Sequence, residues 1–297
     1  MNLLAVVWDF NPTFITIGNF EIRWYSLTWV AALLFGGWLF SYFCKREGKP
    51  SKVSDVTFMY IALGTILGAR IGHCLFYEPE VYLREPLKII TGIRDGGLAS
   101  HGAAIGIVLG IWLSSRKNRV PVLWTADRLG IIAPLSGALI RFGNLFNSEI
   151  IGNETTVPWG FKFMRLREYR NMSVDEVPMR HPTQLYEALC YIVVFVVLFM
   201  LYRRTDVAKR KGFLFGAAMV GIFASRFIIE FIKIDQVNFE KGMTFNMGQW
   251  LSVPFILAGV GFMLWAWYRH KEEPKTATVQ ATTAEDKTSK NKRHFKK

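Results

Sequence analysis

The sequence predicts an all-α polytopic membrane protein with about seven transmembrane helices. Of its 297 residues, 51% are hydrophobic and 15% are aromatic. The apolar residues come in long blocks rather than in the 3.6-residue stripes of a soluble helical bundle. Seven blocks approach the ~20 residues that a membrane-spanning helix needs. They cover residues 24–44, 56–77, 97–114, 126–147, 183–202, 212–234 and 247–268.

The basic residues between the blocks predict how the helices are oriented. Alternate connections, such as "YEPEVYLREPLK", mix both signs of charge. The other connections are basic, and since Lys and Arg in short loops stay in the cytoplasm, we expect the N-terminus outside and the C-terminus in the cytoplasm. The net charge of +13 then reflects topology and attraction to anionic lipid, not nucleic-acid binding. The basic groups are Lys45, Arg46, Lys49 and Lys52, then Arg116, Lys117 and Arg119, then Arg203, Arg204, Lys209, Arg210 and Lys211.

Three segments outside the blocks carry further expectations. The stretch "FITIGNFEIRW" alternates around Gly18 and Asn19, which predicts a two-residue hairpin. Residues 153–181 are too polar to span and too long for a simple connection, so we expect a small head on the outer face of the membrane. Residues 271–297 lack apolar side chains to bury. They predict a disordered cytoplasmic tail after a transmembrane catalytic domain of residues 1–270.

The end of the fourth block carries an unusual group of polar residues. The stretch "ALIRFGNLFNSEIIG" places Arg141, Asn144, Asn147, Ser148 and Glu149 within about three helical turns. A charged residue at the bilayer centre costs about 2.5 to 3.5 kcal/mol on insertion scales, so such groups usually face a protein interior or a wet cavity. We therefore expect a functional site at this edge of the membrane.

Polar residues in the other blocks each have a simple structural explanation. Tyr25 suits an interfacial aromatic anchor, Arg70 an arginine whose charged end extends to the membrane surface, and His101 a packing residue. Gln184 with Glu187 suits a helix cap, and Arg226 with Glu230 suits an ion pair across one helical turn.

The predicted orientation, however, brings these residues to the outer half of the membrane. Tyr25, His101 and Gln184 lie near the starts of blocks that enter from outside, while Arg141 and Arg226 lie near the ends of blocks that finish there. Independent packing residues would be scattered over both leaflets. Because a guanidinium donates two parallel hydrogen bonds to phosphate, the two arginines predict a phosphate-bearing ligand such as a phospholipid head group. The residues alone thus indicate a lipid-handling membrane enzyme or a lipid transporter.

Apart from its tail, the chain resembles the prolipoprotein diacylglyceryl transferases over essentially its full length. The motifs are "DGGLASHGAAIG", "RFGNLFNSEIIG", "RHPTQLYE", "SRFIIEF" and "MGQWLS". The resemblance implies a multi-pass enzyme of the bacterial inner membrane, with a periplasmic N-terminus, a small periplasmic head and a cytoplasmic C-terminus. Its substrates would be phosphatidylglycerol, whose diacylglyceryl group is moved, and a prolipoprotein, whose lipobox cysteine thiol receives it as glycerol phosphate leaves. The positions that match functional residues of the family are Tyr25, His101, Arg141, Asn144, Glu149, Gly152, Arg226 and Glu230.

One position departs from the family pattern. Ile222 stands one turn before Arg226, where family members commonly have a tyrosine. Either this hydroxyl is dispensable here, or another residue such as Tyr186 supplies it.

The resemblance and the chemistry together assign roles. His101 is the first candidate for the base that takes the thiol proton, and Glu149 is the second. Arg141 and Arg226 would neutralise charge on the departing phosphate, and Glu230 completes the expected catalytic set. We expect no cofactor, and no ligand-like spacing of Cys, His and carboxylates indicates a metal. The expected substrate-binding residues are Tyr25, Arg70, Asn144, Gly152, Gln184 and Gln249.

Other classes of protein stay open on the residues alone. A lipid flippase or anionic-lipid transporter would bind through its arginines without chemistry, but it would place polar residues towards both leaflets, and the inner ends of these blocks look plain. An intramembrane serine protease would use Ser136 or Ser148 with His101, and replacing the serine with alanine would discriminate it. A receptor-like binder gives no reason for two buried arginines and a carboxylate.

Overall fold

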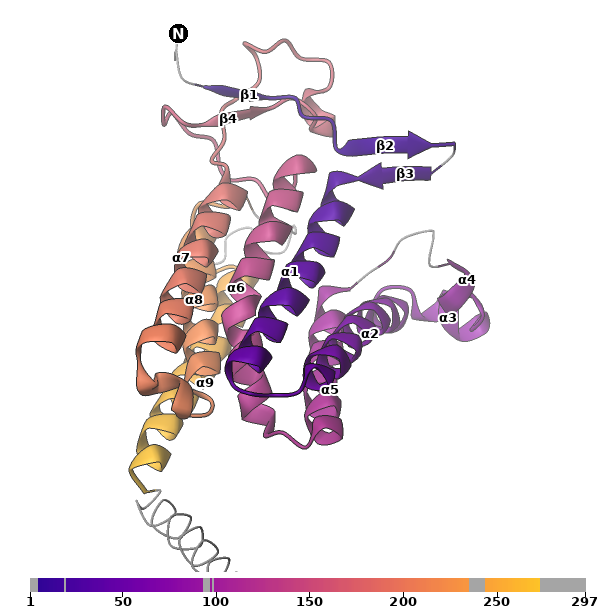
Figure 1. The fold of residues 1–297 in the computed structure, drawn as a ribbon. Helices are drawn as coiled ribbons and strands as arrows, with labels where there is room; N and C mark the ends of the chain where they lie inside the picture. The colour runs from indigo at the N-terminus through magenta and orange to yellow at the C-terminus, as the bar shows by residue number, and fades with distance from the viewer. Residues whose placement is uncertain (1–4, 19, 93–96, 98, 235–243, 273–297) are drawn as a thin grey trace, which may run out of the picture.

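The computed structural model describes residues 5–18, 20–92, 97, 99–234 and 244–272 (Figure 1). Of the expected disordered tail, residues 271–297, all but 271 and 272, which are helical, lie outside the described residues. So do residues 235–243 of the connection before the last block.

The long helices of the described chain follow the predicted blocks. They are α1 (Trp24–Arg46), α2 (Ser51–Phe76), α5 (Ser100–Asn118), α6 (Val122–Phe146), α7 (Thr183–Arg204), α8 (Phe213–Glu230) and α9 (Met247–Glu272). All except α5 are long and apolar enough to cross a membrane, which gives six candidate spans among the described residues. α5 is less apolar than the other long helices because it contains several glycines and has serines and other polar residues at both ends. The predicted polytopic helical architecture is confirmed, but only six of the seven expected spans meet this test.

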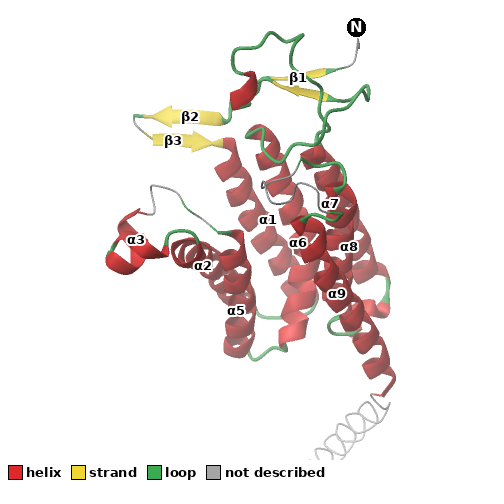
Figure 2. Ribbon diagram, turned by 180° about the vertical axis from the view of Figure 1, so that it is seen from behind, coloured by secondary structure: helices red, strands yellow, loops and turns green. Residues whose placement is uncertain are grey.

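The bundle has two parts on either side of a central pair. α1 and α6 stand between α7, α8 and α9 on one side and α2 and α5 on the other (Figures 1 and 2). α2 and α5 approach backbone to backbone, since a Cβ added at Gly72 would lie 2.7 Å from the Cα of Gly102. Small residues permit such close helix contact in membranes. The glycines beside His101 therefore serve the packing of α5 on α2.

A small head of strands and loops lies over one end of the bundle (Figure 1). β1 (Val6–Trp8) pairs in parallel with β4 (Phe161–Phe163), and the short helix η2 (Arg167–Tyr169) follows. β2 (Thr13–Ile17) and β3 (Phe20–Arg23) form an antiparallel hairpin, which confirms the prediction made around Gly18. The indole Nε1 of Trp8 donates to the carbonyl of Leu145 at 3.1 Å and ties the head to α6.

The opposite end of the bundle is more polar than the sequence indicated. Arg128 is 3% exposed, and its Nη2 lies 2.8 Å from Oε2 of Glu47. The same carboxylate accepts from the indole of Trp124 at 2.6 Å and from the hydroxyl of Tyr202 at 2.9 Å. The neighbouring Asp127 accepts from two backbone N–H groups at the start of α8. The expectation of plain inner ends was wrong, because these charges are buried in pairs and caps that join α1, α6, α7 and α8.

Candidate active site

A cavity of about 510 Å³ lies among α1, α6, α7 and α8 at the head end of the bundle. Five of the sequence-predicted site residues line it, and the structure thereby brings them together from separate helices. These five are Tyr25, Arg141, Asn144, Arg226 and Glu230. Ser100, Tyr191 and Lys233 add further polar groups to the lining.

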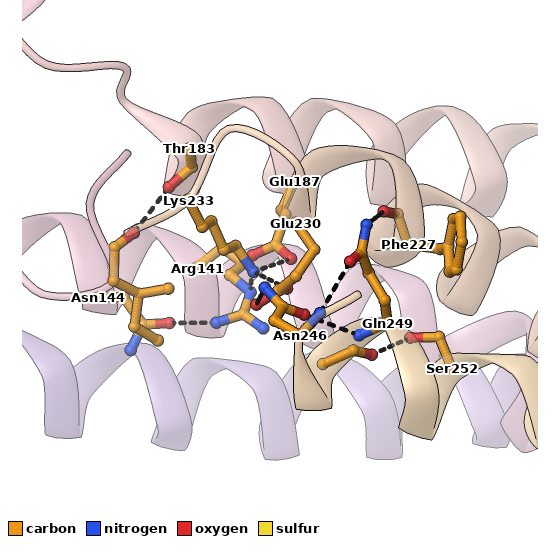
Figure 3. Close-up of polar contacts among 12 residues, drawn as sticks. Arg141, Asn144, Thr183, Glu187, Phe227, Glu230, Lys233, Asn246, Gln249 and Ser252 are labelled. Atoms are coloured by element: carbon orange, nitrogen blue, oxygen red, sulfur yellow. Dashed lines mark hydrogen bonds and ion pairs between the residues drawn. The ribbon is translucent and has the colours of Figure 1, made fainter. Parts of the chain in front are cut away.

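Arg141 is oriented by two neighbours (Figure 3). Its Nε lies 2.7 Å from Oε2 of Glu187, and its Nη1 donates to Oδ1 of Asn144 at 3.1 Å. The contact with Glu187 is an ion pair that lacks the alignment of a hydrogen bond. Glu187 is completely buried, so the guanidinium offsets the cost of burying this carboxylate. Arg141 is therefore fixed in the cavity wall before any ligand binds.

Lys233 joins two buried carboxylates beside the cavity (Figure 3). Its Nζ lies 2.8 Å from Oε1 of Glu187 and 3.0 Å from Oε2 of Glu230. With Arg141 these residues form an alternating chain of two cations and two anions. From the sequence we expect only a capping role for Glu187 and no role for Lys233. The three-residue spacing of Lys233 from Glu230 is the signal that could have found it.

Arg226 also lines the cavity, but without a fixed partner. The ion pair with Glu230 that their four-residue spacing suggests is not formed, because Glu230 pairs with Lys233 instead. Arg226 is half-buried, and within the described part of the chain it makes no ion pair and no hydrogen bond. Its guanidinium is therefore available to an anionic ligand.

Gln249 belongs to a capping box at the start of α9. Oδ1 of Asn246 accepts from the backbone N–H of Gln249 at 3.0 Å, and Oε1 of Gln249 accepts from the backbone N–H of Asn246 at 3.1 Å. Nδ2 of Asn246 then donates to Oε1 of Glu230 at 3.3 Å (Figure 3). Gln249 thus affects the cavity through Asn246 and Glu230 and does not line it.

The turn after α6 is strained and is held by the first residues of α7. Ser148 and Ile150 have φ values of 53° and 59°, a region that a β-branched residue rarely adopts. Nε2 of Gln184 donates to the carbonyl of Glu149 at 2.6 Å, and Oγ1 of Thr183 donates to that of Ile150 at 2.7 Å. Backbone strain of this kind persists only where the surroundings hold it, and it clusters at functional sites. Here it places Ile150 in the cavity wall.

The two candidate bases lie next to lining residues rather than among them. Glu149 is exposed, and its Oε1 accepts from Nδ2 of Asn144 at 2.7 Å. His101 is exposed in the first turn of α5, directly after the lining residue Ser100.

Arg70 and Gly152 also lie outside the lining, in packed surroundings. Nε of Arg70 donates to the carbonyl of Ile89 at 2.9 Å, and its guanidinium lies 5.1 Å from the ring centroid of Tyr82. Arg70 thereby anchors α3 (Pro79–Arg84) and α4 (Lys88–Thr91) to α2. A Cβ added at Gly152 would lie 2.6 Å from the Cβ of His181, so this position has no room for a side chain.

The cavity has a hydroxyl close to the position where the family pattern leads us to expect one. Ile222 lines the cavity, whereas Tyr186 does not; the Tyr186 hydroxyl accepts from Nε1 of Trp159 at 2.8 Å. Tyr191 of α7 is 4% exposed, lines the same cavity and belongs to the same apolar cluster as Ile222. Nothing in the sequence distinguishes Tyr191, which is one of many aromatic residues in apolar blocks.

A second cavity, of about 490 Å³, adjoins the first. The two share Tyr25, Trp29 and Ser100, while the rest of the second lining is mostly apolar and comes from α1, α2 and α5. A polar space with two arginines thus lies next to an apolar one. The residues that the structure describes include no cluster of three His, Cys, Asp or Glu side chains that could hold a metal ion.

Long apolar helices identify a multi-span membrane protein. A cavity lined by two arginines beside a mostly apolar one has the chemistry to receive a phosphate-bearing amphiphile. The sequence profile of one family, prolipoprotein diacylglyceryl transferase, matches residues 12–265. The chain belongs to the prolipoprotein diacylglyceryl transferase family.

Individual relatives agree with this assignment over most of their length. A protein of Tolumonas auensis is 46% identical over 258 residues, which cover 86% of this chain and 96% of the relative. A protein of Porphyromonas gingivalis is 45% identical over 266 residues, which cover 87% and 94%. One of Bacteroides fragilis is 38% identical over 272 residues, which cover 88% and 95%. Each of the three is named a phosphatidylglycerol–prolipoprotein diacylglyceryl transferase.

Proposed function

We propose that this chain transfers the diacylglyceryl group of phosphatidylglycerol to the lipobox cysteine of prolipoproteins. The observation that carries the proposal is that Arg141 and Arg226, from different helices, line one cavity. In the reaction, the cysteine sulfur forms a bond to a glyceryl carbon, and the bond from that carbon to the phosphate oxygen breaks. The thiol proton passes to a base, and glycerol phosphate leaves with the bonding electrons.

The two arginines have different tasks in this proposal. Arg226 has no hydrogen-bond or ion-pair partner among the described side chains, so its guanidinium is free to bind the phosphate. Arg141 is held by Glu187 and Asn144, so its positive charge is already in place. The attraction between this charge and the phosphate grows as the phosphate departs and becomes more negative. Glu230 keeps Lys233 in place, and Lys233 in turn balances Glu187.

The remaining predicted residues divide into contacts and supports. Tyr25 and Asn144 are lining residues that we expect to hydrogen-bond the lipid head group. Gln184 acts by holding the strained turn, and Gln249 by capping α9 beside Glu230. Arg70 and Gly152 act on the site through the packing of α2 and of the segment after α6, without touching substrate.

The acyl chains of the lipid belong in the second cavity. Its lining is mostly apolar, and it shares Tyr25 and Trp29 with the polar cavity. A lipid whose phosphate contacts Arg226 can therefore place its chains between α1 and α2 without exposing them to water.

His101 is the proposed base, with Glu149 as the alternative. His101 follows the lining residue Ser100 and is exposed, so an approaching thiol can reach it. Glu149 contacts the cavity wall only through Asn144.

We further propose that the head is periplasmic and that the enzyme lies in the bacterial inner membrane. The basic connections α1–α2, α5–α6 and α7–α8 lie at the end opposite the head, as cytoplasmic loops should. In this arrangement α5 crosses the membrane as a seventh helix, covered by α2. Residues 1–270 then form one catalytic domain, and residues 153–181 lie where the prolipoprotein arrives.

Mass spectrometry of a lipobox peptide, incubated with purified enzyme and phosphatidylglycerol, tests the function. We expect the peptide to gain one diacylglyceryl unit, and we expect Arg226→Ala to abolish the gain. A cleaved peptide would instead support a protease. Movement of lipid between leaflets without any peptide product would support a transporter.

A further inference from the structure

A basic cavity of about 300 Å³ lies at the end of the bundle opposite the candidate active site. The start of α6, the α7–α8 connection with its short helix η3 (Asp206–Lys209), and the end of α9 form its walls. Helix α6 separates the two sites: Pro121 borders this cavity and Arg141 the other, about 30 Å apart at 1.5 Å per helical residue. The basic cavity is therefore not an extension of the active site.

Four cations line the basic cavity, and no carboxylate does. They are Lys209, Arg210, Lys211 and Arg269. Lys209 pairs with the exposed Asp206 at 2.6 Å, whereas the other three form no ion pair with any residue that the structure describes. The concentration of unpaired positive charge indicates an anionic ligand.

The two arginines are held by indole rings instead of by acids. The guanidinium of Arg210 lies 3.6 Å from the ring centroid of Trp267, and that of Arg269 lies 5.0 Å from that of Trp265. Stacking orients a guanidinium while leaving its N–H groups free to donate. Nη1 of Arg210 is buried and has no hydrogen-bond acceptor among the described residues. Burying a charged donor without an acceptor costs free energy, so we expect a ligand to supply the missing acceptor.

We propose that the basic cavity binds a phosphate-bearing anion. Phosphate oxygens accept paired hydrogen bonds from a guanidinium, and the additional lysines balance the second charge. The rest of the lining includes Val122, Leu123 and Trp265, which continue the apolar surfaces of α6 and α9. The same chemistry therefore fits the head group of an anionic phospholipid or a free phosphate, and basic pockets between membrane helices bind anionic head groups.

The test compares two double variants of the full chain. Arg210→Gln with Arg269→Gln removes two charges from the basic cavity. Lys52→Gln with Lys117→Gln removes two charges from exposed positions at the same end that do not line the cavity, and it is the matched control. Both are made in an Arg226→Ala background, so that lipid bound at the active site does not obscure the result.

Two probes distinguish the sources of phosphate. Native mass spectrometry measures binding of phosphatidic acid against neutral phosphatidylcholine, and thermal unfolding measures the effect of inorganic phosphate. For a lipid ligand we expect the cavity variant to bind phosphatidic acid about 10-fold more weakly, since losing a charged hydrogen bond costs more than one factor of ten. If the ligand is free phosphate, we expect inorganic phosphate to raise the Tm of the control variant and to leave the Tm of the cavity variant unchanged.

Equal behaviour of the two variants with both probes would overturn the proposal. If replacing Arg210 disturbs Trp267 and impairs folding, the single variant Arg269→Gln, which changes an exposed side chain, repeats both measurements. Neither readout needs transfer activity, so the outcome is independent of the proposed function.

Discussion

Lys233 and Glu187 form a buried ion pair of 2.8 Å although 46 residues separate them in the chain. The pair joins the segment after α8 to the first turns of α7. The other oxygen of Glu187 faces Arg141 at 2.7 Å, and Lys233 also contacts Glu230. The position of a catalytic candidate on α6 is thus coupled, through Glu187, to a lysine in the segment after α8.

Replacing Lys233 with Met should therefore reduce both stability and transfer. The change leaves Glu187 and Glu230 buried with one cation fewer, and breaking a buried ion pair typically costs about 3 to 5 kcal/mol. Lys233→Arg, which keeps the charge, should lose much less. Unfolding in detergent and the transfer assay measure the two effects, with the exposed Lys52→Met as control. Equal stability of the Lys233→Met and Lys52→Met proteins would contradict the coupling.

The two arginines should respond differently to replacement by alanine. Arg226→Ala should abolish transfer and leave the free energy of unfolding within about 0.5 kcal/mol, because Arg226 has no partner among the described residues. Arg141→Ala should abolish transfer and also destabilise the protein, because it removes an ion-pair partner of the buried Glu187. Lysine should rescue neither, because it lacks the planar fork. Substantial activity in both lysine variants would argue against phosphate binding by the guanidiniums.

The sequence predicted the helices and about half of the site for the same physical reason. A lipid bilayer demands long apolar blocks and makes each charge within them conspicuous, so Arg141 and Arg226 could be found without a structure. Lys233 was not identified from the sequence, because α8 ends at Glu230 and only the fold shows that the chain then turns back towards Glu187. The Arg226–Glu230 pair was predicted from helix spacing alone, which cannot reveal a better partner for Glu230. His101 and Glu149 were identified by motif, and the structure places both beside the lining.

Tyr191 should supply the hydroxyl that Ile222 lacks. It lines the cavity and packs in the cluster that contains Ile222. Tyr191→Phe should lower the transfer rate with little change in stability, and adding Ile222→Tyr should restore part of the rate by returning a hydroxyl to the same wall. Comparing kcat of the single and double variants measures this rescue. A fully active Tyr191→Phe protein would show that the hydroxyl is dispensable.

The head should lose stability at mildly acidic pH because of His181. Desolvation holds the pKa of His181 below its usual value of 6.5, and Nδ1 lies 3.2 Å from the Tyr186 hydroxyl. Below pH 6.5 the unfolded chain therefore binds more protons at this site than the folded chain does. The stabilising contribution of the neutral ring is thus complete above pH 6.5 and declines as the pH falls through that value. We expect the Tm difference between the parent and His181→Gln to shrink from pH 8 to pH 5, and a constant difference would exclude His181 as the titrating group.

His101, in the first turn of α5, is the proposed base. If His101 takes the thiol proton, His101→Gln should bind phosphatidylglycerol normally and lose about 100-fold to 10,000-fold in rate at neutral pH. Because His101 is exposed, we expect its replacement to leave folding intact, and a Tm measurement checks this. Raising the pH towards the thiol pKa of about 8.5 should restore part of the rate, because solution hydroxide then supplies the thiolate. The decisive measurement is the pH and rate profile of the variant beside that of the parent. A deficit that stays constant above the thiol pKa would mean that His101 only orients the lipid, and the same profile for Glu149→Gln would then show whether the carboxylate beside Asn144 is the base.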